Sequence, residues 1–242
     1  MHDHKRERDA ELQRDYYKKA AAHYDAAHVS QTDEHAIALA WLSAIVDQCQ
    51  YQSVLDIGAG TGRALNYLRD KPGVKVIGVE PSVHMRKLGH EKGIPEDQLV
   101  DGDALALAFP DNHFDVVCSF GVLHHIRDHA KAVSEMVRVA RKAVFISDSN
   151  NFGQGTLTTR VIKQTLRALH LWGLFDLLRT RGKGYHYSEG DGIFYSYSVF
   201  NDIPIIKSKF NHILYMSTRP SGHNLFRSAP TLAIWARQSR DE

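Results

Sequence analysis

The chain lacks any apolar run long enough to cross a membrane, and it has only two cysteines among its 242 residues. A transmembrane helix needs about 18 or more apolar residues, so no membrane insertion is expected. The charged start, MHDHKRERDAELQRD, has no apolar stretch and is not typical of a secretory signal. Cys49 and Cys118 lie far apart in apolar surroundings, which indicates free thiols in a reducing compartment. A cytoplasmic protein is therefore expected.

The charge is almost balanced overall but unevenly distributed. The formal net charge is +2, yet acidic residues outnumber basic ones over 1–150 and basic residues outnumber acidic ones over 151–242. A basic carboxyl-terminal part can attract an anionic substrate. It can equally be a solvated basic helix, and the sequence leaves both readings open.

Short apolar segments alternate with helical ones along the first 150 residues, which predicts strands at 53–57, 75–80, 99–100, 114–119 and 143–147. Such alternation specifies a mostly parallel sheet with helices on both faces, the doubly wound Rossmann-like α/β fold. Further helices are predicted at 8–24, 34–48 and 155–180. Final strands at 212–217 and 231–237 bring the expected sheet to seven strands.

A glycine loop follows the first strand, which runs from Ser53 to Ile57 into the sequence GAGTG at 58–62. Glycines permit the tight turn and let a ligand approach the backbone, and the next helix offers free N–H groups. Glu80 ends the second strand, where an acidic side chain can accept hydrogen bonds from ribose hydroxyls. A nicotinamide dinucleotide and S-adenosylmethionine both fit this geometry.

A series of motifs separates these two cofactors. It comprises VLDIGAGTGR at 54–63, VEPS at 79–82 with Met85 after it, GDA at 102–104, FPD at 109–111, FDVV at 114–117 and FGVLHHI at 120–126. The series resembles the successive motifs of class I S-adenosylmethionine-dependent methyltransferases, of the type 11 group. The glycine spacing G-x-G-x-x-G that is usual in dehydrogenases is absent.

The resemblance implies that S-adenosylmethionine is the cofactor, and it assigns roles by position. The glycine loop and Asp56 would receive the methionine part, Glu80 the ribose, and Asp103 the adenine amino group. Tyr16 and Tyr24 could cap the donor pocket or only pack between helices. The residues implied to contact the donor are Tyr24, Asp56, Gly58, Ala59, Gly60, Thr61, Gly62, Glu80, Pro81, Ser82, Met85, Gly102, Asp103, Ala104, Phe120, Gly121 and His125.

The acceptor site is expected in the part of the chain that the donor motifs leave unexplained. One domain covers 1–242, with N-terminal helices at 1–50, the donor-binding core at 51–150, a substrate-covering insertion at 151–210 after the fifth strand, and the final strands at 211–242. The insertion contains a tyrosine-rich stretch at 182–197, which is either a binding loop or an ordinary β-hairpin. Its candidate substrate residues are Tyr185, Tyr187, Tyr195 and Tyr197.

Three side chains are candidate general bases: His124, His186 and Glu189. Histidine takes up a hydroxyl proton near neutral pH, although His124 could instead cap the next helix. No metal is expected, because His125 and His129 stand four residues apart with no third ligand in sequence.

A small molecule or glycan is the expected methyl acceptor, with O-methylation favoured. An RNA methyltransferase is the first alternative, but the base-methylating motif Asp/Asn-Pro-Pro-Tyr/Phe is replaced by SFGV at 119–122, and no appended RNA-binding module is present. A non-catalytic, cofactor-binding subunit is the second alternative. The sequence carries no information on oligomeric state.

Overall fold

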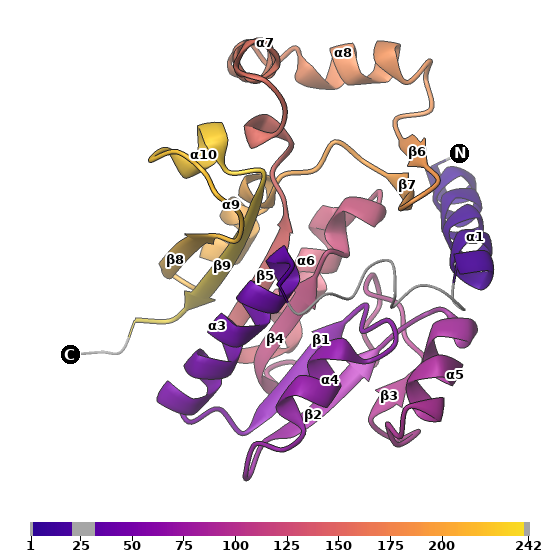
Figure 1. Cartoon of the computed structure of the whole chain (residues 1–242), viewed down its shortest axis with the longest axis vertical. Helices are drawn as coiled ribbons and strands as arrows, with labels where there is room; N and C mark the ends of the chain where they lie inside the picture. Colours follow the sequence, from indigo (N-terminus) through magenta and orange to yellow (C-terminus); the bar gives the residue numbers. More distant parts are fainter. Residues whose placement is uncertain (1, 21–31, 240–242) are drawn as a thin grey trace.

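A seven-stranded sheet forms the centre of the computed structural model, which describes residues 2–20 and 32–239 (Figure 1). The strand order is β3-β2-β1-β4-β5-β9-β8. The strands are β1 (Ser53–Ile57), β2 (Lys75–Val79), β3 (Leu99–Val100), β4 (Phe114–Phe120), β5 (Ala140–Ser149), β8 (His212–Ser217) and β9 (Thr231–Arg237).

The five strands from β3 to β5 are parallel, whereas β9 runs antiparallel to β5 and β8 antiparallel to β9. The predicted mostly parallel, seven-stranded sheet is confirmed. The chain moves outward in one direction from β1 to β3 and in the other from β4 to β5. The carboxyl ends of β1 and β4 therefore flank a topological switch point, where open α/β sheets bind ligands.

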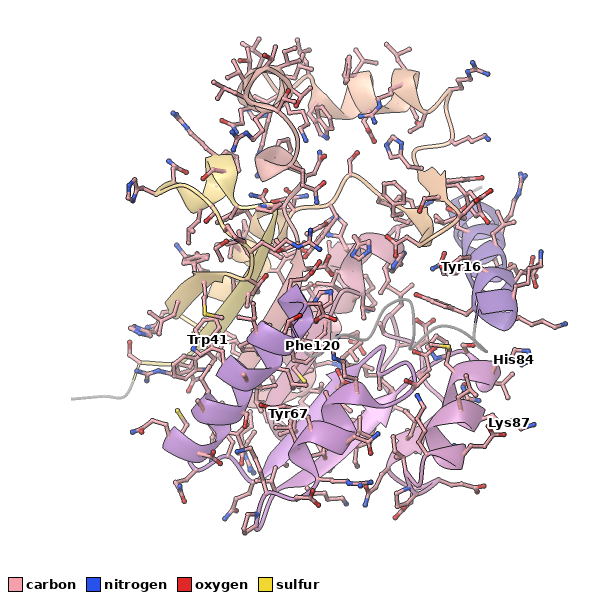
Figure 2. The ribbon with its side chains drawn as sticks, in the orientation of Figure 1. Tyr16, Trp41, Tyr67, His84, Lys87 and Phe120 are labelled. Carbon is pink, nitrogen blue, oxygen red and sulfur yellow. The ribbon has the colours of Figure 1, made fainter. Side chains whose placement is uncertain are left out.

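Both faces of the sheet are buried, and the strand residues alternate between two apolar clusters. Leu55 and Ile57 belong to the cluster under α6 (His129–Val139) and α9 (Ile203–Lys207), and Val54 to the cluster under α3 (Glu34–Gln48) and α4 (Arg63–Leu68). Trp41 of α3 packs edge-on against Phe145 of β5 (Figure 2). Helix α5 (Val83–Glu91) lies beside β3 at the edge of the sheet.

After β5 the chain leaves the sheet and forms the upper layer of Figure 1. The short helix η3 (Asn151–Gly153) leads to α7 (Leu157–Ala168) and α8 (Trp172–Arg179). The single helix predicted over 155–180 is wrong, because His170 adopts a left-handed φ of 58° and turns the chain between two helices. A continuous helical pattern in the sequence does not reveal such a turn.

A two-stranded hairpin, β6 (His186–Ser188) and β7 (Gly192–Phe194), follows α8. The chain then returns to the body through η4 (Val199–Asn201) and α9, where Ile206 and Phe210 are fully buried. The part of the predicted insertion that lies above the sheet therefore ends before residue 199. A short helix, α10 (Leu225–Ser228), precedes β9.

Helix α1 (His2–Ala20) packs against β7, almost the whole chain away in sequence (Figure 1). It begins earlier than the helix predicted at 8–24, and the last four residues of that prediction lie outside the described part of the chain. Tyr24, a predicted donor contact, lies outside the described residues. None of the described helices has the length and apolar character needed to traverse a bilayer.

Candidate active site

The glycine loop turns sharply at the carboxyl end of β1. Gly58, Gly60 and Gly62 all have positive φ, at 68°, 56° and 84°. A Cβ at Gly58 would lie 2.6 Å from Val122, and one at Gly62 would lie 1.9 Å from Ile94, so packing requires both glycines. A Cβ at Gly60 would meet only Met85, at 3.7 Å. At Gly60 the backbone is therefore open to a ligand.

Two buried carboxylates lie at this loop. The carboxylate of Glu80 accepts hydrogen bonds from the backbone N–H groups of Gly60 (3.0 Å) and Ser82 (2.8 Å). Asp56 is 3% exposed, and among the described residues its carboxylate receives a hydrogen bond only from the Cys118 thiol, at 3.8 Å. Burial, with a smaller contribution from Glu80, raises the pKa of Asp56 to about 8. Burial also raises the pKa of Glu80.

These features fit S-adenosylmethionine, which carries an ammonium, a sulfonium and two ribose hydroxyls. A buried carboxyl with a single weak donor and a raised pKa is the group that a cationic ligand stabilises in its charged form. The Glu80 carboxylate uses two of about four acceptor positions, so the ribose hydroxyls could still donate to it.

The other predicted donor residues surround the loop in two groups. Ala59, Thr61, Phe120, Gly121 and His125 line a cavity together with Asp56, Gly58 and Gly60. The remaining residues do not line that cavity. Gly62 ends the glycine loop before α4, and the others lie around β2, α5 and the turn after β3; they are Glu80, Pro81, Ser82, Met85, Gly102, Asp103 and Ala104. The donor contacts thus remain predictions on both sides of the loop.

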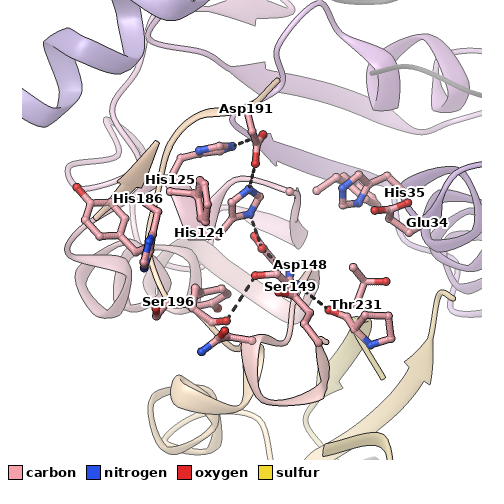
Figure 3. Close-up of a pocket in the computed structure, with 18 of the residues that line it drawn as sticks. Glu34, His35, His124, His125, Asp148, Ser149, His186, Asp191, Ser196 and Thr231 are labelled. Atoms are coloured by element: carbon pink, nitrogen blue, oxygen red, sulfur yellow. Dashed lines mark hydrogen bonds and ion pairs between the residues drawn. The ribbon is translucent and has the colours of Figure 1, made fainter. Parts of the chain in front are cut away.

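The cavity measures about 1100 Å³ and extends from the glycine loop to the upper layer. Strand ends form its floor, and α7, α8 and the β6–β7 hairpin contribute residues on the opposite side. Figure 3 shows His186 and Asp191 of the hairpin region together with His124. These upper-layer residues include Ile162, Lys163, Trp172, Phe175, Arg179, His186 and Asp191. The volume is large enough for an acceptor beside the donor.

His124 lies between two carboxylates at the centre of this cavity (Figure 3). Its Nδ1 is 2.6 Å from the Asp148 carboxylate and its Nε2 is 3.5 Å from that of Asp191. Asp148 is fully buried and also accepts hydrogen bonds from the N–H groups of Leu123 and Ser149. Burial alone would lower the pKa of His124. The charges and hydrogen bonds of Asp148 and Asp191 outweigh burial and raise that pKa to about 10.

A histidine with that pKa is an imidazolium at neutral pH, so it cannot take up a proton from an acceptor. The geometry therefore argues against His124 as the general base and favours a role in positioning Asp191. His125 completes the arrangement, because its Nε2 lies 3.4 Å from Asp191 and its Nδ1 donates to the carbonyl of Ile193 at 2.5 Å.

The same three side chains, His124, His125 and Asp191, place one ligand atom each within 4.8 Å of one another. Metal binding would require His124 to lose its proton and its contact with Asp191. His129 does not join this group, since its Nδ1 pairs with Asp202 at 2.9 Å. The arrangement is therefore that of an ion-pair cluster.

His186 has the geometry of an oriented base. Its Nε2 donates to the Asp176 carboxylate at 3.2 Å, and Ser196 donates to the same oxygen at 2.7 Å. The His186 ring stacks on Phe194 with centroids 5.4 Å apart, which fixes its plane. No described residue hydrogen-bonds to Nδ1, and His186 lines the cavity. A carboxylate that holds one ring nitrogen leaves the other as a proton acceptor.

The remaining acceptor-site candidates divide by position. Glu189 and Tyr187 are exposed, and Tyr187 is 62% exposed. Tyr185, Tyr187 and Glu189 do not line the cavity. Tyr195 and Tyr197 do line it, but their hydroxyls donate to the carboxylates of Asp9 and Asp202. Two residues of the tyrosine-rich stretch thus line the cavity, while their hydroxyls are committed to structural hydrogen bonds.

Helix α1 is attached to the hairpin by polar contacts. Asp9 accepts hydrogen bonds from Arg127 and from the Tyr195 hydroxyl, both at 2.7 Å. Gln13 accepts from the N–H of Ile193 at 2.7 Å and donates to the carbonyl of Asp191 at 3.2 Å. The ring of Tyr16 lies against Gly192, where a Cβ would approach it to 2.9 Å. Helix α1 therefore holds the segment that carries Asp191.

Three cations gather at the upper end of the cavity without a carboxylate partner among the described residues: Arg160, Lys163 and Arg179. Lys163 and Arg179 line the cavity, and the buried Nε of Arg160 has no hydrogen-bond partner among the described residues. Burial, followed by the charges of Arg179 and Arg160, lowers the pKa of Lys163. Such a group favours a ligand with negative charge at this end.

Sequence reasoning missed Asp148 and Asp176 as site residues, and it noted Asp191 only as a carboxylate of the tyrosine-rich stretch. Asp148 follows the apolar part of β5, and an acid at the carboxyl end of a buried strand was a usable signal. Asp176 sits in an apolar helix and Asp191 in a turn, and only the tertiary fold brings them to the histidines.

Comparison with known proteins gives the same assignment as the geometry. Residues 55–146 match the family described as "Methyltransferase domain". Demethylmenaquinone methyltransferase of Renibacterium salmoninarum is 35% identical over 121 residues, 49% of this chain and 50% of that protein. An uncharacterized methyltransferase of Geobacillus thermodenitrificans is 30% identical over 141 residues, 56% of this chain and 62% of that protein. The matches thus span about half to three fifths of these relatives.

The fold likeness extends over nearly the whole chain. Magnesium protoporphyrin IX methyltransferase of Synechocystis, solved with bound S-adenosylhomocysteine, matches with a TM-score of 0.61 over 96% of this chain and 100% of that one, at 15% identity. The predicted family, fold and cofactor are confirmed together. Residues 55–146 thus match a methyltransferase domain, and nearly the whole chain shares the fold of solved methyltransferases.

Proposed function

We propose that this protein transfers a methyl group from S-adenosylmethionine to a hydroxyl group of a small molecule or glycan. The observation that carries the proposal is the His186–Asp176 pair, which faces the cavity with one ring nitrogen available. A nearby base is needed for a hydroxyl acceptor, which loses a proton on methylation. A cytoplasmic location is part of the same proposal.

Separate residues are assigned to the donor and to the acceptor. We assign Asp56 and the backbone at Gly60 to the methionine end of the donor, and Glu80 to its ribose. When bound, the donor supplies a methyl group activated by its sulfonium. The protein then needs to align the acceptor with that methyl and to exclude water.

His186 Nδ1 accepts the hydroxyl proton in this scheme, while Asp176 stabilises the resulting imidazolium through Nε2. Asp191, held by His124 and His125, is the second polar group that an acceptor hydroxyl would meet. Glu189 is a weaker candidate because it is exposed and lies outside the cavity.

The cavity walls indicate the chemistry of the acceptor. Trp172, Phe175 and Phe194 present apolar ring faces, and Lys163 and Arg179 add positive charge. A flat or apolar acceptor with an anionic group fits these walls best. Two similar proteins are named for demethylmenaquinone and magnesium protoporphyrin IX, which agrees with a ring-containing acceptor.

Incubation with methyl-labelled S-adenosylmethionine and fractionated metabolites or glycans tests the proposal. The wild type should label a discrete product. Gly60→Arg should label none, because its side chain fills the loop at the one glycine that packing leaves open. Labelling of RNA alone, or of no fraction, would contradict the proposal.

The base assignment is tested on the product so identified. His186→Gln should lower turnover about 10²- to 10⁴-fold while donor affinity stays unchanged. His113→Gln is the matched control, since this ring stacks on Phe109 outside the cavity. Full turnover in His186→Gln would mean that catalysis proceeds by alignment alone.

A further inference from the structure

Helix α7 presents its apolar face to solvent and its polar face to the protein. Leu157, Val161 and Leu169 are 69%, 54% and 60% exposed, and no residue of the helix is buried. The polar side chains point inward. Gln164 donates hydrogen bonds to the carbonyls of Phe152 and Arg227. Arg167 donates to the side chain of Asn201, and Lys163 donates to Asn151. A helix of a soluble protein normally has the opposite arrangement.

Helix α8 repeats this reversal. Its one buried residue is Asp176, which binds His186 and Ser196. Leu174 and Leu178, one turn apart, are 58% and 69% exposed. Nine of the sixteen large apolar side chains that are exposed in the described part of the chain lie on α7, α8 or the turn between them; they are Leu157, Val161, Ile162, Leu169, Leu171, Leu174, Phe175, Leu177 and Leu178. Scattered exposed apolar residues are ordinary, whereas a concentration of this kind marks an interaction surface.

The charge around this surface has one sign. Residues 157–183 contain six basic residues and one acidic residue, Asp176, whose carboxylate is buried. Arg179, Arg181 and Lys183 are exposed where α8 ends and the chain descends to the hairpin. Apolar side chains beside exposed cations fit a surface that is apolar inside and anionic outside.

We propose that the α7–α8 hairpin docks on the surface of an anionic lipid bilayer, lying in the interface without crossing it. A second copy of the chain is a poorer occupant, because a symmetric contact would set the same cations against themselves. Ile162, Trp172 and Phe175 line the cavity from these two helices, so docking would place the membrane beside the cavity wall. Helices α7 and α8 form the layer farthest from α4 and α5 in Figure 1, which leaves their outer side unobstructed.

Co-sedimentation with vesicles tests this docking in the absence of donor and acceptor, so the result is independent of the proposed methyl transfer. The wild type should sediment with equimolar phosphatidylcholine–phosphatidylglycerol vesicles, less with phosphatidylcholine alone, and less again at high salt. The double variant Leu174→Ser/Leu178→Ser should reduce the partition coefficient about tenfold or more. It should leave the melting temperature unchanged, because both side chains are exposed.

Tyr67→Ser/Leu214→Ser is the matched control, since these side chains are 52% and 42% exposed on α4 and β8. This variant should bind vesicles as the wild type does, because Tyr67 lies well away from helices α7 and α8 in Figure 2. Arg181→Gln/Lys183→Gln should weaken binding to the anionic vesicles and reduce its salt dependence. The proposal is overturned if the wild type binds neither vesicle, if the leucine variant binds equally well, or if sedimentation equilibrium shows a dimer that this variant loses.

Discussion

Donor binding should release a proton from Asp56 and should therefore strengthen as the pH rises. The buried carboxyl has a pKa of about 8 in the free protein, so about 1 in 100 molecules is ionised near pH 6 and half are ionised near pH 8. If only the carboxylate form accepts the cationic donor, affinity should rise about 50-fold over that interval. The interval ends there because the donor's own α-amino group begins to lose its charge at about pH 8.

Isothermal titration calorimetry with S-adenosylmethionine measures both the donor affinity and the number of protons released on binding. Titrations at a series of pH values give the affinity, and repetition in buffers of different ionisation enthalpy gives the number of protons released. Asp56→Asn should bind about 10- to 100-fold more weakly at pH 8, because a charge-assisted contact is lost. It should also abolish proton release.

Asp115→Asn is the control for this titration. Asp115 is also fully buried, but it pairs with Arg141 and Lys142 at the amino end of β4, away from the cavity. Its variant should keep the pH dependence of donor binding even if it is less stable. A wild-type affinity that is equal at pH 6 and pH 8, with no proton release, would refute the reasoning.

Two further predictions concern Glu80 and His124. Glu80→Ala should weaken donor binding by about 1–3 kcal/mol, since two ribose hydroxyls lose a charged acceptor; an unchanged dissociation constant would show that Glu80 does not face the ribose. The ion pair of His124 with Asp148 should stabilise the fold fully below pH 6.5, the unfolded pKa, and be lost as the pH rises through about 10. Urea unfolding should therefore give a free energy that falls by about 2–3 kcal/mol between pH 8 and pH 10. The fall should be absent in His124→Gln, and its persistence there would assign the effect to another group.

The sheet was predictable because its information is local. Each strand is a short apolar run, as at Ser53–Ile57, and the register then follows from burial on both faces. The glycine loop and Glu80 were predictable for the same reason, because a turn of this kind needs particular residues at fixed spacing. All seven predicted sheet strands occur in the structure.

The acceptor end was less predictable, because hydrophobic patterns do not reveal which face of a helix points inward. The period of α7 is clear in its sequence, but its polar side points to the body because Asn151, Phe152 and Asn201 offer hydrogen bonds there. His124 was predicted as a candidate base, and it does line the cavity. Its protonation state depends on two carboxylates that lie 24 and 67 positions further along the chain.

The attachment of α1 to the β6–β7 hairpin has a consequence for how the protein is made. Asp9 and Gln13 find their partners about 180 residues later, at Ile193 and Tyr195. Helix α1 leaves the ribosome well before its docking site, which is made only after most of the sheet. During synthesis α1 must wait while the strands from β1 to β5 assemble. The contacts around Asp191 should thus be among the last to form, and a chain arrested before residue 190 would possess the glycine loop without a closed cavity.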